Sequence, residues 1–418
     1  MVKICILIPD FTICSGANTQ SLHLAQTLKN LSAQPFLVFG LNAEAPLGKP
    51  CHDNNFLGQL GKSGIPFYQK PENLKKKWES YKYFYKFFFD HREDFQLVYI
   101  NGMSNMICWF VLFFKLLGKK VVIKMTGIGI NDPLTLEKLP AYNRLLLKIL
   151  YITDKFVGTS TALCESYRNS YLFPQSKLVQ IPNGVNTDLF SPLTDDLNKK
   201  ELKKRLGIPV NDKIVTYIGS VRRGKGIDLL FNCWEQVLEK HPDATLLVVG
   251  PLCPLCPAVR LQDKEFVDLL RKKVGIFLVE DKEVVKMLIL SKPKNKIQLL
   301  GTKNNIYEYL QASDLFVFLS RSEGMPNALM EAMASGLPSV TLDIDEISRD
   351  LITGNEYGHK IEGENLIALV SSISDLLSNP EKCSHIGKAS REKILKEFKI
   401  EEIAQKHLAL YRELLDKS

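Results

Sequence analysis

The chain has 418 residues, of which 45% are hydrophobic and 24% are charged, and its formal net charge is +8. A single hydrophobic core rarely serves so long a chain, so we expect two domains of roughly 200 residues each. The composition excludes a disordered or fibrous protein. The positive charge favours an anionic partner such as a nucleotide diphosphate, an acidic membrane surface or nucleic acid.

The sequence predicts a cytoplasmic protein. The first residues, Met1–Pro9, are apolar but lack a small-residue cleavage site, which favours a buried strand over a signal peptide. The longest apolar run, Met106–Phe114, stops at Lys115 and is too short to span a bilayer. Nine cysteines, an odd number, fit a reducing compartment better than a disulfide framework.

Strand-like and helix-like segments alternate along the first part of the chain. Expected strands are Val2–Ile8, Leu97–Ile100, Val121–Met125 and Lys155–Val157. A helical pattern follows Gly16 and runs to Leu31, and another from Asn105 to Leu117 ends at Gly118. Turn residues cluster at Ile181–Pro192, and we place an interdomain linker near residues 183–200.

The alternation then begins again. Expected strands are Lys213–Ser220, Ala244–Gly250, Lys296–Gly301 and Leu315–Ser320, with a helix over Ile227–Glu239. Residues 251–295 form a longer insertion, for which we expect helices near Phe266–Lys273 and Lys282–Leu290. Alternating strands and helices predict an α/β protein with two Rossmann-like, doubly wound parallel-sheet domains that face an interdomain cleft. The expected domains are residues 1–190 and 200–398, and a C-terminal helix at about residues 400–418 can pack back on the first.

Residues 320–340, SRSEGMPNALMEAMASGLPSV, place one glutamate in a loop and another in the next helix. Gly324 permits close backbone approach, and Pro326 suits a helix start, so the free amides there can bind a phosphate or a sugar hydroxyl. Glu323 and Glu331 either cap and solvate this helix or accept hydrogen bonds from ligand hydroxyls. The spacing by itself leaves both interpretations open.

A resemblance to a known family shifts the interpretation toward a ligand. The stretch SEGMPNALMEAMASGLP resembles the E-x7-E signature of glycosyltransferase family 4, a group of retaining enzymes with the GT-B fold. IPNGVNTDLFSP is similar to the linker of that family, and YIGSVRRGKGIDLL to its strand, basic loop and helix. LLGTKNNIYEYLQASDLFVFLSRSEG matches the run that leads into the signature, so the resemblance covers most of residues 181–338 in the family's order.

The resemblance implies a role for each matching residue. Glu331 would hold the ribose hydroxyls of a nucleoside-diphosphate sugar, and Lys225 and Arg222 would bind its diphosphate, whose negative charge grows as it leaves. The donor sugar would be held by Glu323 and by the backbone of Gly324, Met325, Pro326 and Asn327. We name Glu323, Arg222 and Lys225 as catalytic and expect no metal, since the GT-B pattern needs none. A solvated, charged turn is the other interpretation of the basic loop.

The sequence departs from the family at three places. Ser220 stands where an arginine often follows the strand glycine, so Arg222 or Arg223 must supply the guanidinium, and we choose Arg222. The first loop has a single glycine, Gly16, which either approaches the donor phosphate or only makes a turn. No histidine lies between His91 and His241, where relatives carry one, and backbone of residues 127–129 could substitute.

Three further motifs each have two interpretations. Asp343-Ile-Asp345 mimics a metal-binding DxD, and Cys253 and Cys256 form a lone CxxC, but neither has the partners that a metal site requires. Residues 70–90 carry six lysines and two glutamates before Phe87, a balance of 6 − 2 = +4. If these residues form a helix, one stripe of it consists of Leu74, Trp78, Tyr81, Tyr85 and Phe88, with Lys75, Lys82 and Lys86 along its flank. This stripe would either face the core of the protein or bind an anionic membrane.

The function that we expect is retaining sugar transfer to a saccharide or a lipid-linked acceptor, in polysaccharide, lipopolysaccharide or glycolipid synthesis. The protein would be cytoplasmic and could bind the inner face of the cytoplasmic membrane. A nucleotide-sugar epimerase of GT-B fold, or a catalytically silent sugar-nucleotide-binding protein, are the alternatives. Nucleic-acid binding is disfavoured because the basic residues form no recognisable motif.

Overall fold

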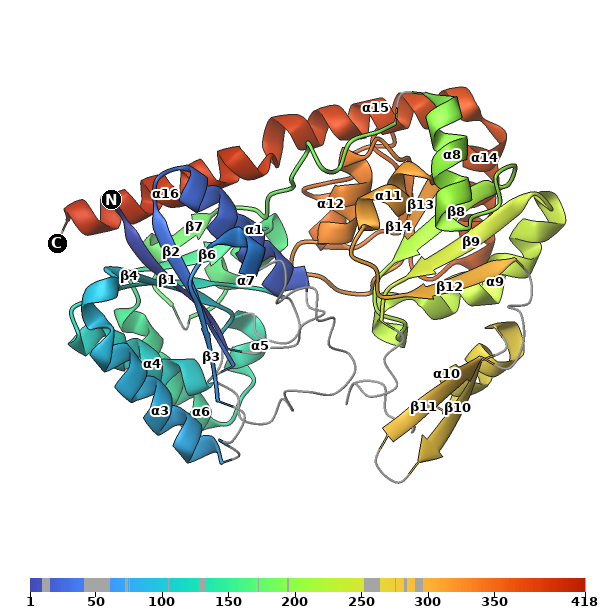
Figure 1. Cartoon of the computed structure of the whole chain (residues 1–418). Helices are drawn as coiled ribbons and strands as arrows, with labels where there is room; N and C mark the ends of the chain where they lie inside the picture. Colours follow the sequence, from blue (N-terminus) through green and yellow to red (C-terminus); the bar gives the residue numbers. More distant parts are fainter. Residues whose placement is uncertain are drawn as a thin grey trace. The chain divides into compact units, whose positions relative to one another are not determined.

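The computed structural model places the chain in two compact units (Figure 1). It describes residues 1–9, 16–40, 61–71, 74, 76–103, 105–127, 133–171, 173–193, 195–251, 264–274, 276–281, 284–289 and 296–417. The amino-terminal unit comprises Met1–Asn186, Glu323–Met325 and Phe398–Ser418, and the carboxy-terminal unit comprises Thr187–Ser322 and Pro326–Glu397. The chain thus passes from one unit to the other inside the expected linker region.

The amino-terminal unit is built on a parallel sheet with the strand order β3-β2-β1-β4-β5-β6-β7. Its strands are β1 (Lys3–Ile8), β2 (Gln34–Phe39), β3 (Phe67–Gln69), β4 (Leu97–Asn101), β5 (Lys120–Lys124), β6 (Lys155–Gly158) and β7 (Leu178–Gln180). Its first helices are α1 (Gly16–Asn30), α3 (Lys77–Asp90), α4 (Asn105–Leu116), α5 (Pro133–Glu137), α6 (Ala141–Leu147) and α7 (Thr161–Arg168). All the strands and helices that we expected between residues 2 and 158 are present, with ends shifted by one or a few residues.

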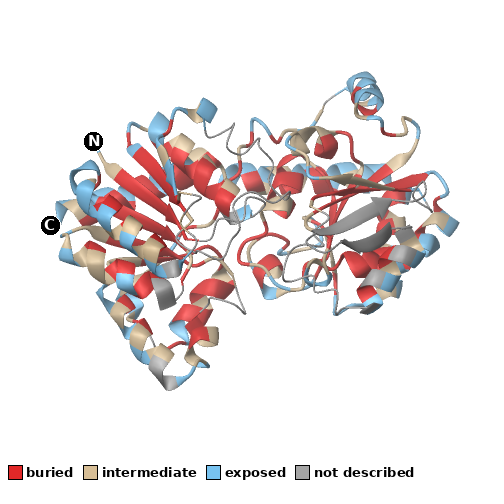
Figure 2. Ribbon diagram, turned by 60° about the horizontal axis from the view of Figure 1, so that its bottom comes forward, coloured by how far each residue is buried: buried red, intermediate tan, exposed pale blue. Residues whose placement is uncertain are grey.

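Alternating side chains of these strands fill two separate cores. Side chains on one face, including Ile6, Tyr99 and Val122, pack with α1 and with the C-terminal helix α16 (Ile400–Asp416). Those on the other face, including Val98 and Ile123, pack with α3 and α4. Figure 2 shows these strands as an almost continuous buried layer between helices, as expected for a parallel sheet covered on both faces.

The carboxy-terminal unit contains a second parallel sheet, with the strand order β12-β9-β8-β13-β14-β15. Its strands are β8 (Lys213–Ile218), β9 (Ala244–Val249), β12 (Ile297–Gly301), β13 (Leu315–Phe318), β14 (Ser339–Leu342) and β15 (His359–Ile361). Its helices are α8 (Asp196–Leu206), α9 (Ile227–Lys240), α10 (Lys264–Leu269), α11 (Ile306–Gln311), α12 (Asn327–Ala334), α13 (Asp345–Ser348), α14 (Leu366–Ser378) and α15 (Pro380–Glu397). The chain moves outward from β8 in one direction and from β13 in the other, so the order reverses between these two neighbours.

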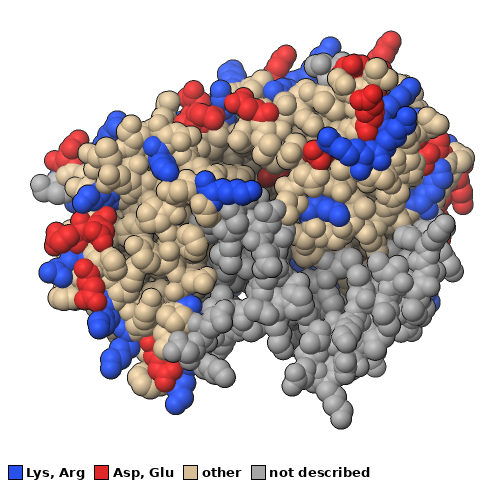
Figure 3. All heavy atoms as spheres, in the orientation of Figure 1, with Lys and Arg blue, Asp and Glu red and all other residues tan. Residues whose placement is uncertain are grey.

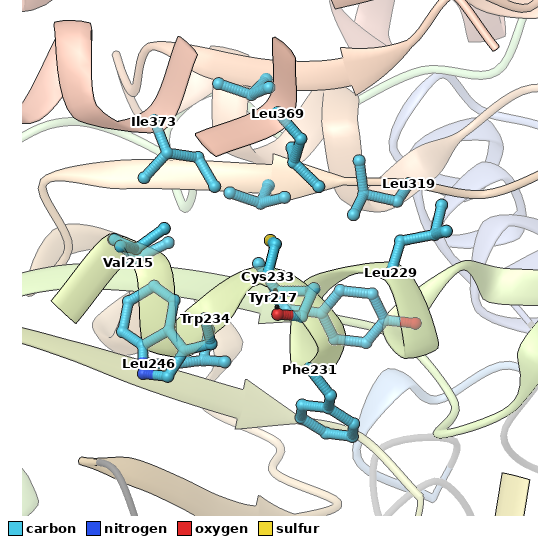
Figure 4. Packing of buried hydrophobic residues seen from close by; sticks show 14 of the residues in the cluster. Val215, Tyr217, Leu229, Phe231, Cys233, Trp234, Leu246, Leu319, Leu369 and Ile373 are labelled. Carbon is cyan, nitrogen blue, oxygen red and sulfur yellow. Dashed lines mark hydrogen bonds between the residues drawn. The ribbon is translucent and has the colours of Figure 1, made fainter. Parts of the chain in front are cut away.

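The core of this unit fixes where its loops emerge. Trp234 and Phe231 of α9, Tyr217 of β8, and Leu369 and Ile373 of α14 form one buried cluster (Figure 4). Burying a large side chain of this kind contributes about 1.5–3 kcal/mol, so the register of α9 against β8 is strongly determined. The turn between them therefore has a fixed position.

One element of the insertion differs from our expectation. The helix expected near Phe266–Lys273 is present as α10 and a π-helical turn at Leu270–Val274. The helix expected over Lys282–Leu290 is wrong, because Val284–Ile289 is strand β11 and pairs antiparallel with β10 (Ile276–Asp281). The pairing decides the structure here, since β10 offers residues 284–289 a hydrogen-bond ladder, and the β-branched Val284 and Val285 suit a strand.

The last helix belongs to the amino-terminal unit. Its start is tied to the end of that unit by backbone hydrogen bonds, from Val185 N to Phe398 O at 2.8 Å and from Ile400 N to Val185 O at 3.0 Å. Among the described residues, no helix is long and apolar enough to cross a membrane.

Candidate functional site

The loops that follow β8 and β13 lie together at the point where the strand order of the second sheet reverses. In open α/β sheets, ligands bind at the carboxyl ends of the strands at such a reversal. The loop after β8 is the basic loop of residues 219–226, and the loop after β13 is the acidic loop of residues 319–326. The structure thus brings together the two motifs that the sequence separates by about 100 residues.

The two loops touch directly at Gly226. This glycine has a φ of +70°, and a Cβ atom there would lie 1.8 Å from the carbonyl oxygen of Leu319. A backbone hydrogen bond from Arg321 N to Gly224 O, at 3.1 Å, joins the same loops. Only glycine combines this left-handed conformation with so close an approach, and helix α9 begins at the next residue.

The basic loop is held from below by Tyr217. Its phenolic oxygen lies 3.2 Å from Ser220 O and 3.3 Å from Lys225 O, so a single hydroxyl spans the loop. Residues Arg223–Lys225 form one 3-10 turn. The turn leads directly into α9, so its basic residues adjoin the free amides at the start of that helix, a composition that suits an anion.

The two arginines of the loop have different surroundings. Arg223 is exposed and pairs with Glu265 of α10 at 3.1 Å. Arg222 is half-buried, and its Nε atom is buried with no hydrogen-bond partner in the described part of the chain. A buried guanidinium N–H without a partner is unusual in a folded protein, and this distinguishes Arg222 from the exposed, paired Arg223.

Helix α12 carries Glu331 as its fifth residue, facing inward. Pro326 precedes the helix and Asn327 opens it, and the first helical hydrogen bond runs from Met330 N to Pro326 O at 3.1 Å. The helix ends where Gly336, with a φ of +74°, donates to Met333 O and Leu337 donates to Ala332 O. Amides in the first turn are therefore left without intrahelical acceptors.

The carboxyl group of Glu331 belongs to a buried residue. Its side chain belongs to a residue only 9% exposed, and burial raises its pKa from 4.5 to about 8. Within the described ranges no residue donates a hydrogen bond to its carboxylate. Capping and solvation, the second interpretation of the sequence, do not fit a buried acid, whereas hydroxyl donors of a ligand would satisfy it.

The acidic loop also contains a residue that the sequence reasoning missed. The Arg321 guanidinium donates to both carboxylate oxygens of Asp228, each at 2.9 Å, and to Glu364 at 2.5 and 3.0 Å. It also donates to the carbonyl oxygen of Arg223 in the basic loop. Asp228 is 93 residues away and Glu364 is 43 residues away, so no local pattern reveals these partners.

The other residues of the acidic loop are mostly buried or half-buried. Glu323 is half-buried, while Gly324, Met325 and Pro326 are buried, and Asn327 is half-buried at the helix start. Ser320 Oγ donates to Ser322 O at 3.2 Å within the loop. Glu323 and the residues up to Pro326 lie directly before α12, and Asn327 is its first residue. Their contact with a donor sugar stays a prediction.

Gly16 and the proposed substitute for the histidine lie in the amino-terminal unit. Gly16 is the first residue of α1, and the loop before it lies outside the described residues. Gly127 follows β5 at the carboxyl end of the first sheet, whereas residues 128–132 are also outside the description. Their roles therefore stay predictions.

The candidate metal motifs have other partners or are not described. Asp343 accepts a hydrogen bond from Ser348 and lies 3.7 Å from Lys360, and Asp345 pairs with Arg349 at 3.4 Å. The described residues contain no group of three or more His, Cys, Asp or Glu that could hold a metal ion. Cys253 and Cys256 lie outside the described residues.

The aromatic stripe of residues 74–88 faces largely inward. Phe88 is fully buried, and Tyr85 stacks on Phe110 of α4 with ring centroids 4.7 Å apart. Trp78 is an exception, since it is 61% exposed at the start of α3. Lys82 and Lys86 are exposed, and Lys75 lies outside the described residues. Along the lower left of Figure 3, where α3 lies, basic and acidic side chains alternate.

Comparison with known families matches residues 198–393 to the family described as "Glycosyl transferases group 1". This stretch contains Arg222, Lys225, Glu323 and Glu331, whereas Gly16 lies outside it. The match therefore covers both loops of the site and the helices that follow them.

Curated proteins that resemble the chain are named as sugar transferases or synthases. The lipopolysaccharide core biosynthesis mannosyltransferase LpsB of Rhizobium meliloti is 28% identical over 56% of this chain. The N-acetyl-alpha-D-glucosaminyl L-malate synthase of Bacillus anthracis is 23% identical over 78%, and an Escherichia coli galactosyltransferase acting on alpha-D-GlcNAc-diphosphoundecaprenol is 27% identical over 57%. The chain spans 60%, 76% and 55% of the lengths of these relatives, respectively.

Solved structures with the same fold cover almost the whole chain. HepE of Anabaena in complex with UDP and glucose is 16% identical, with a TM-score of 0.74 over 98% of this chain and 100% of that one. WaaG, a glycosyltransferase involved in lipopolysaccharide biosynthesis, is 14% identical, with a TM-score of 0.66 over 98% and 99%. The predicted fold class, a GT-B protein with two parallel-sheet α/β units, is confirmed.

Proposed function

Residues 198–393 match the family of group 1 glycosyltransferases, and from this premise we propose that the chain transfers a sugar from a nucleoside-diphosphate sugar to an acceptor hydroxyl with retention. The observation that carries this proposal is the direct contact of the basic and acidic loops at the strand-order reversal. Cations of the basic loop and amides at the start of α9 suit a diphosphate, and the carboxylates of Glu323 in the acidic loop and of Glu331 in α12 suit hydroxyl groups.

Different residues of the site bind different parts of the sugar donor. Lys225 and Arg222 bind the diphosphate and offset the negative charge that it gains on leaving, which is the electrostatic part of catalysis. Glu331 accepts hydrogen bonds from the ribose diol in its buried position. Glu323 and the backbone of the loop up to Asn327 hold the donor sugar, and Gly16 contacts the phosphates.

No protein nucleophile is included in this proposal. Retention then follows from displacement on one face of the sugar, with the leaving phosphate taking the acceptor proton. The reaction needs no metal ion, so activity should survive EDTA. Analysis of the product anomer by NMR against the donor anomer tests retention directly, and an inverted product would reject it.

The acceptor class is proposed from the relatives. Their names include a lipopolysaccharide core, a GlcNAc-diphosphoundecaprenol and an L-malate acceptor, so their acceptors vary widely. We place this chain in polysaccharide, lipopolysaccharide or glycolipid synthesis, in the cytoplasm, with a saccharide or lipid-linked acceptor.

We also propose that the protein binds the anionic inner face of the cytoplasmic membrane through α3 and its flank. The exposed Trp78 next to the exposed Lys82 and Lys86 supports this, since aromatic and basic side chains together favour a lipid interface. In liposome flotation, Lys75/Lys82/Lys86→Glu should lose binding. The triple variant Lys200/Lys388/Lys396→Glu, with the same charge change on exposed positions of α8 and α15, should retain it.

The main experiment is a donor screen by ligand-induced thermal shift, followed by transfer assays with the donor that binds. We expect Lys225→Ala to abolish most of the shift and Lys213→Ala, at the opposite end of β8, to leave it unchanged. Conversion of the donor without acceptor would indicate an epimerase instead. Binding without transfer or hydrolysis across a broad acceptor panel would indicate a silent binding protein.

A further inference from the structure

Arg321 occupies a place that no motif assigns. It lies in the acidic loop two residues before Glu323, and its side chain reaches back to the basic loop and to the first turn of α9. Its backbone N–H also donates to Gly224 O at 3.1 Å. One residue therefore ties the loop that would hold the sugar to the loop that would hold the diphosphate.

The contact with Asp228 is not an ordinary surface ion pair. Exposed pairs contribute little to stability because water and salt screen them. The Asp228 side chain is only 8% exposed, and both of its oxygens accept from the guanidinium in a two-point arrangement. Glu364 is 48% exposed and adds two further bonds on the outer side. The fork geometry is one that arginine provides and lysine does not.

The charge of Asp228 explains why this pairing matters for the site. Asp228 lies in the first turn of α9, three residues after Lys225, where the helix amides and cations should attract an anion. An uncompensated carboxylate there would repel a diphosphate and reduce the positive potential of the loop. Arg321 offsets the charge of Asp228 without using the cations of the basic loop, and the second carboxylate that it binds, Glu364, is half-exposed, where water screens its charge.

We propose that Arg321 is a positioning residue, which pairs with Asp228 and offsets its charge so that the diphosphate meets a positively charged loop. This inference rests on the proposed function. It assigns no contact between Arg321 and the substrate, because the guanidinium is occupied by Asp228, Glu364 and the Arg223 carbonyl.

The test measures binding of inorganic pyrophosphate to the full chain by isothermal titration calorimetry, because pyrophosphate reports on the basic loop whatever the nucleobase and sugar. We expect Arg321→Gln to weaken binding by about 10-fold or more while the protein still melts cooperatively. Asp228→Asn alone should bind at least as well as wild type, and adding it to Arg321→Gln should restore affinity to within about 3-fold of wild type. The pyrophosphate affinity of Arg321→Lys, which keeps the positive charge but not the two-point geometry, should fall between those of wild type and Arg321→Gln.

A purely structural pair would behave differently. Asp228→Asn would then weaken pyrophosphate binding as much as Arg321→Gln, and the double variant would stay weak, which would overturn the proposal. If Arg321→Gln does not fold, the comparison of Asp228→Asn with Arg321→Lys decides in the same way. Arg349→Gln, which breaks the pair with Asp345 on α13, is the control and should bind like wild type.

The outcomes also separate this inference from the proposed function. Failure of wild type to bind pyrophosphate, UDP and GDP alike would reject the donor site itself. Binding by wild type that depends on Lys225 but is unchanged in Arg321→Gln would keep the donor site and reject only the role of Arg321.

Discussion

Replacing Glu331 by glutamine should stabilise the protein without ligand and weaken its binding to the nucleotide. The acid is buried and its carboxylate has no hydrogen-bond donor in the described part of the chain. Its pKa is raised from 4.5 to about 8 because burial disfavours the charged form. An uncharged amide of the same shape avoids that cost.

The sign and size of the expected change in stability follow from the pKa values of Glu331 in the folded and unfolded states. The folded state keeps its proton up to about pH 8, whereas the unfolded state loses it near pH 4.5. The stability that protonation contributes is therefore complete below pH 4.5 and is lost as the pH rises through 8. The full difference is about 5 kcal/mol (3.5 pH units at 1.36 kcal/mol each), of which about 2 kcal/mol is lost between pH 6 and pH 8.

The assay is thermal unfolding of wild type and Glu331→Gln at pH 6 and pH 8. For a unit of this size, about 2 kcal/mol corresponds to roughly 4–8 °C, so the Tm advantage of the variant should grow by that amount at the higher pH. Binding of the donor identified by the screen should weaken in the same variant, because an amide donates where the diol needs an acceptor. Binding of inorganic pyrophosphate, which has no ribose, should be unchanged.

Two results would refute this reasoning. A Tm difference that does not vary between pH 6 and pH 8 would mean that Glu331 has no raised pKa and no desolvation cost. Unchanged nucleotide affinity in a folded variant would mean that the carboxylate does not contact the ribose.

Three other variants test further parts of the structure. Lys225→Ala should lower turnover by about 10²–10³ by removing a preorganised charge from the leaving group, and near-normal turnover in a transfer assay would reject its role. Gly226→Ala should destabilise the protein strongly because its Cβ would meet a backbone carbonyl, whereas Gly224→Ala, with open space, should change the Tm little. Lys124→Met removes an ammonium whose pKa burial lowers from 10.5 to about 8. The free energy of unfolding of wild type should therefore rise by about 2–3 kcal/mol between pH 8 and pH 10.5, and that of the variant should not. Denaturation experiments across this alkaline pH range measure the difference.

The sequence contained enough information to predict several strands of each sheet, some of the helices and the residue types of both loops, whereas strands such as β2, β7 and β15 were not predicted. Val215, Val248 and Val317 lie in short buried strands, and Gly336 ends α12, because burial period and backbone freedom are properties of a few neighbouring residues. The same local reasoning failed at residues 284–289, where a pairing strand rather than local pattern decided the structure. Family resemblance identified the residues of the two loops, and the match over residues 198–393 confirmed that resemblance.

Only the tertiary structure decided what those residues have as neighbours. The strand order places β8 beside β13, so the basic and acidic loops meet, and no sequence distance predicts that contact. Burial of Glu331 and the three-way pairing of Arg321 also depend on elements far apart in the chain. The physical reason is that desolvation and ion pairing depend on the groups that surround a side chain in space. Periodicity, turns and motifs depend only on residues that are neighbours in the sequence.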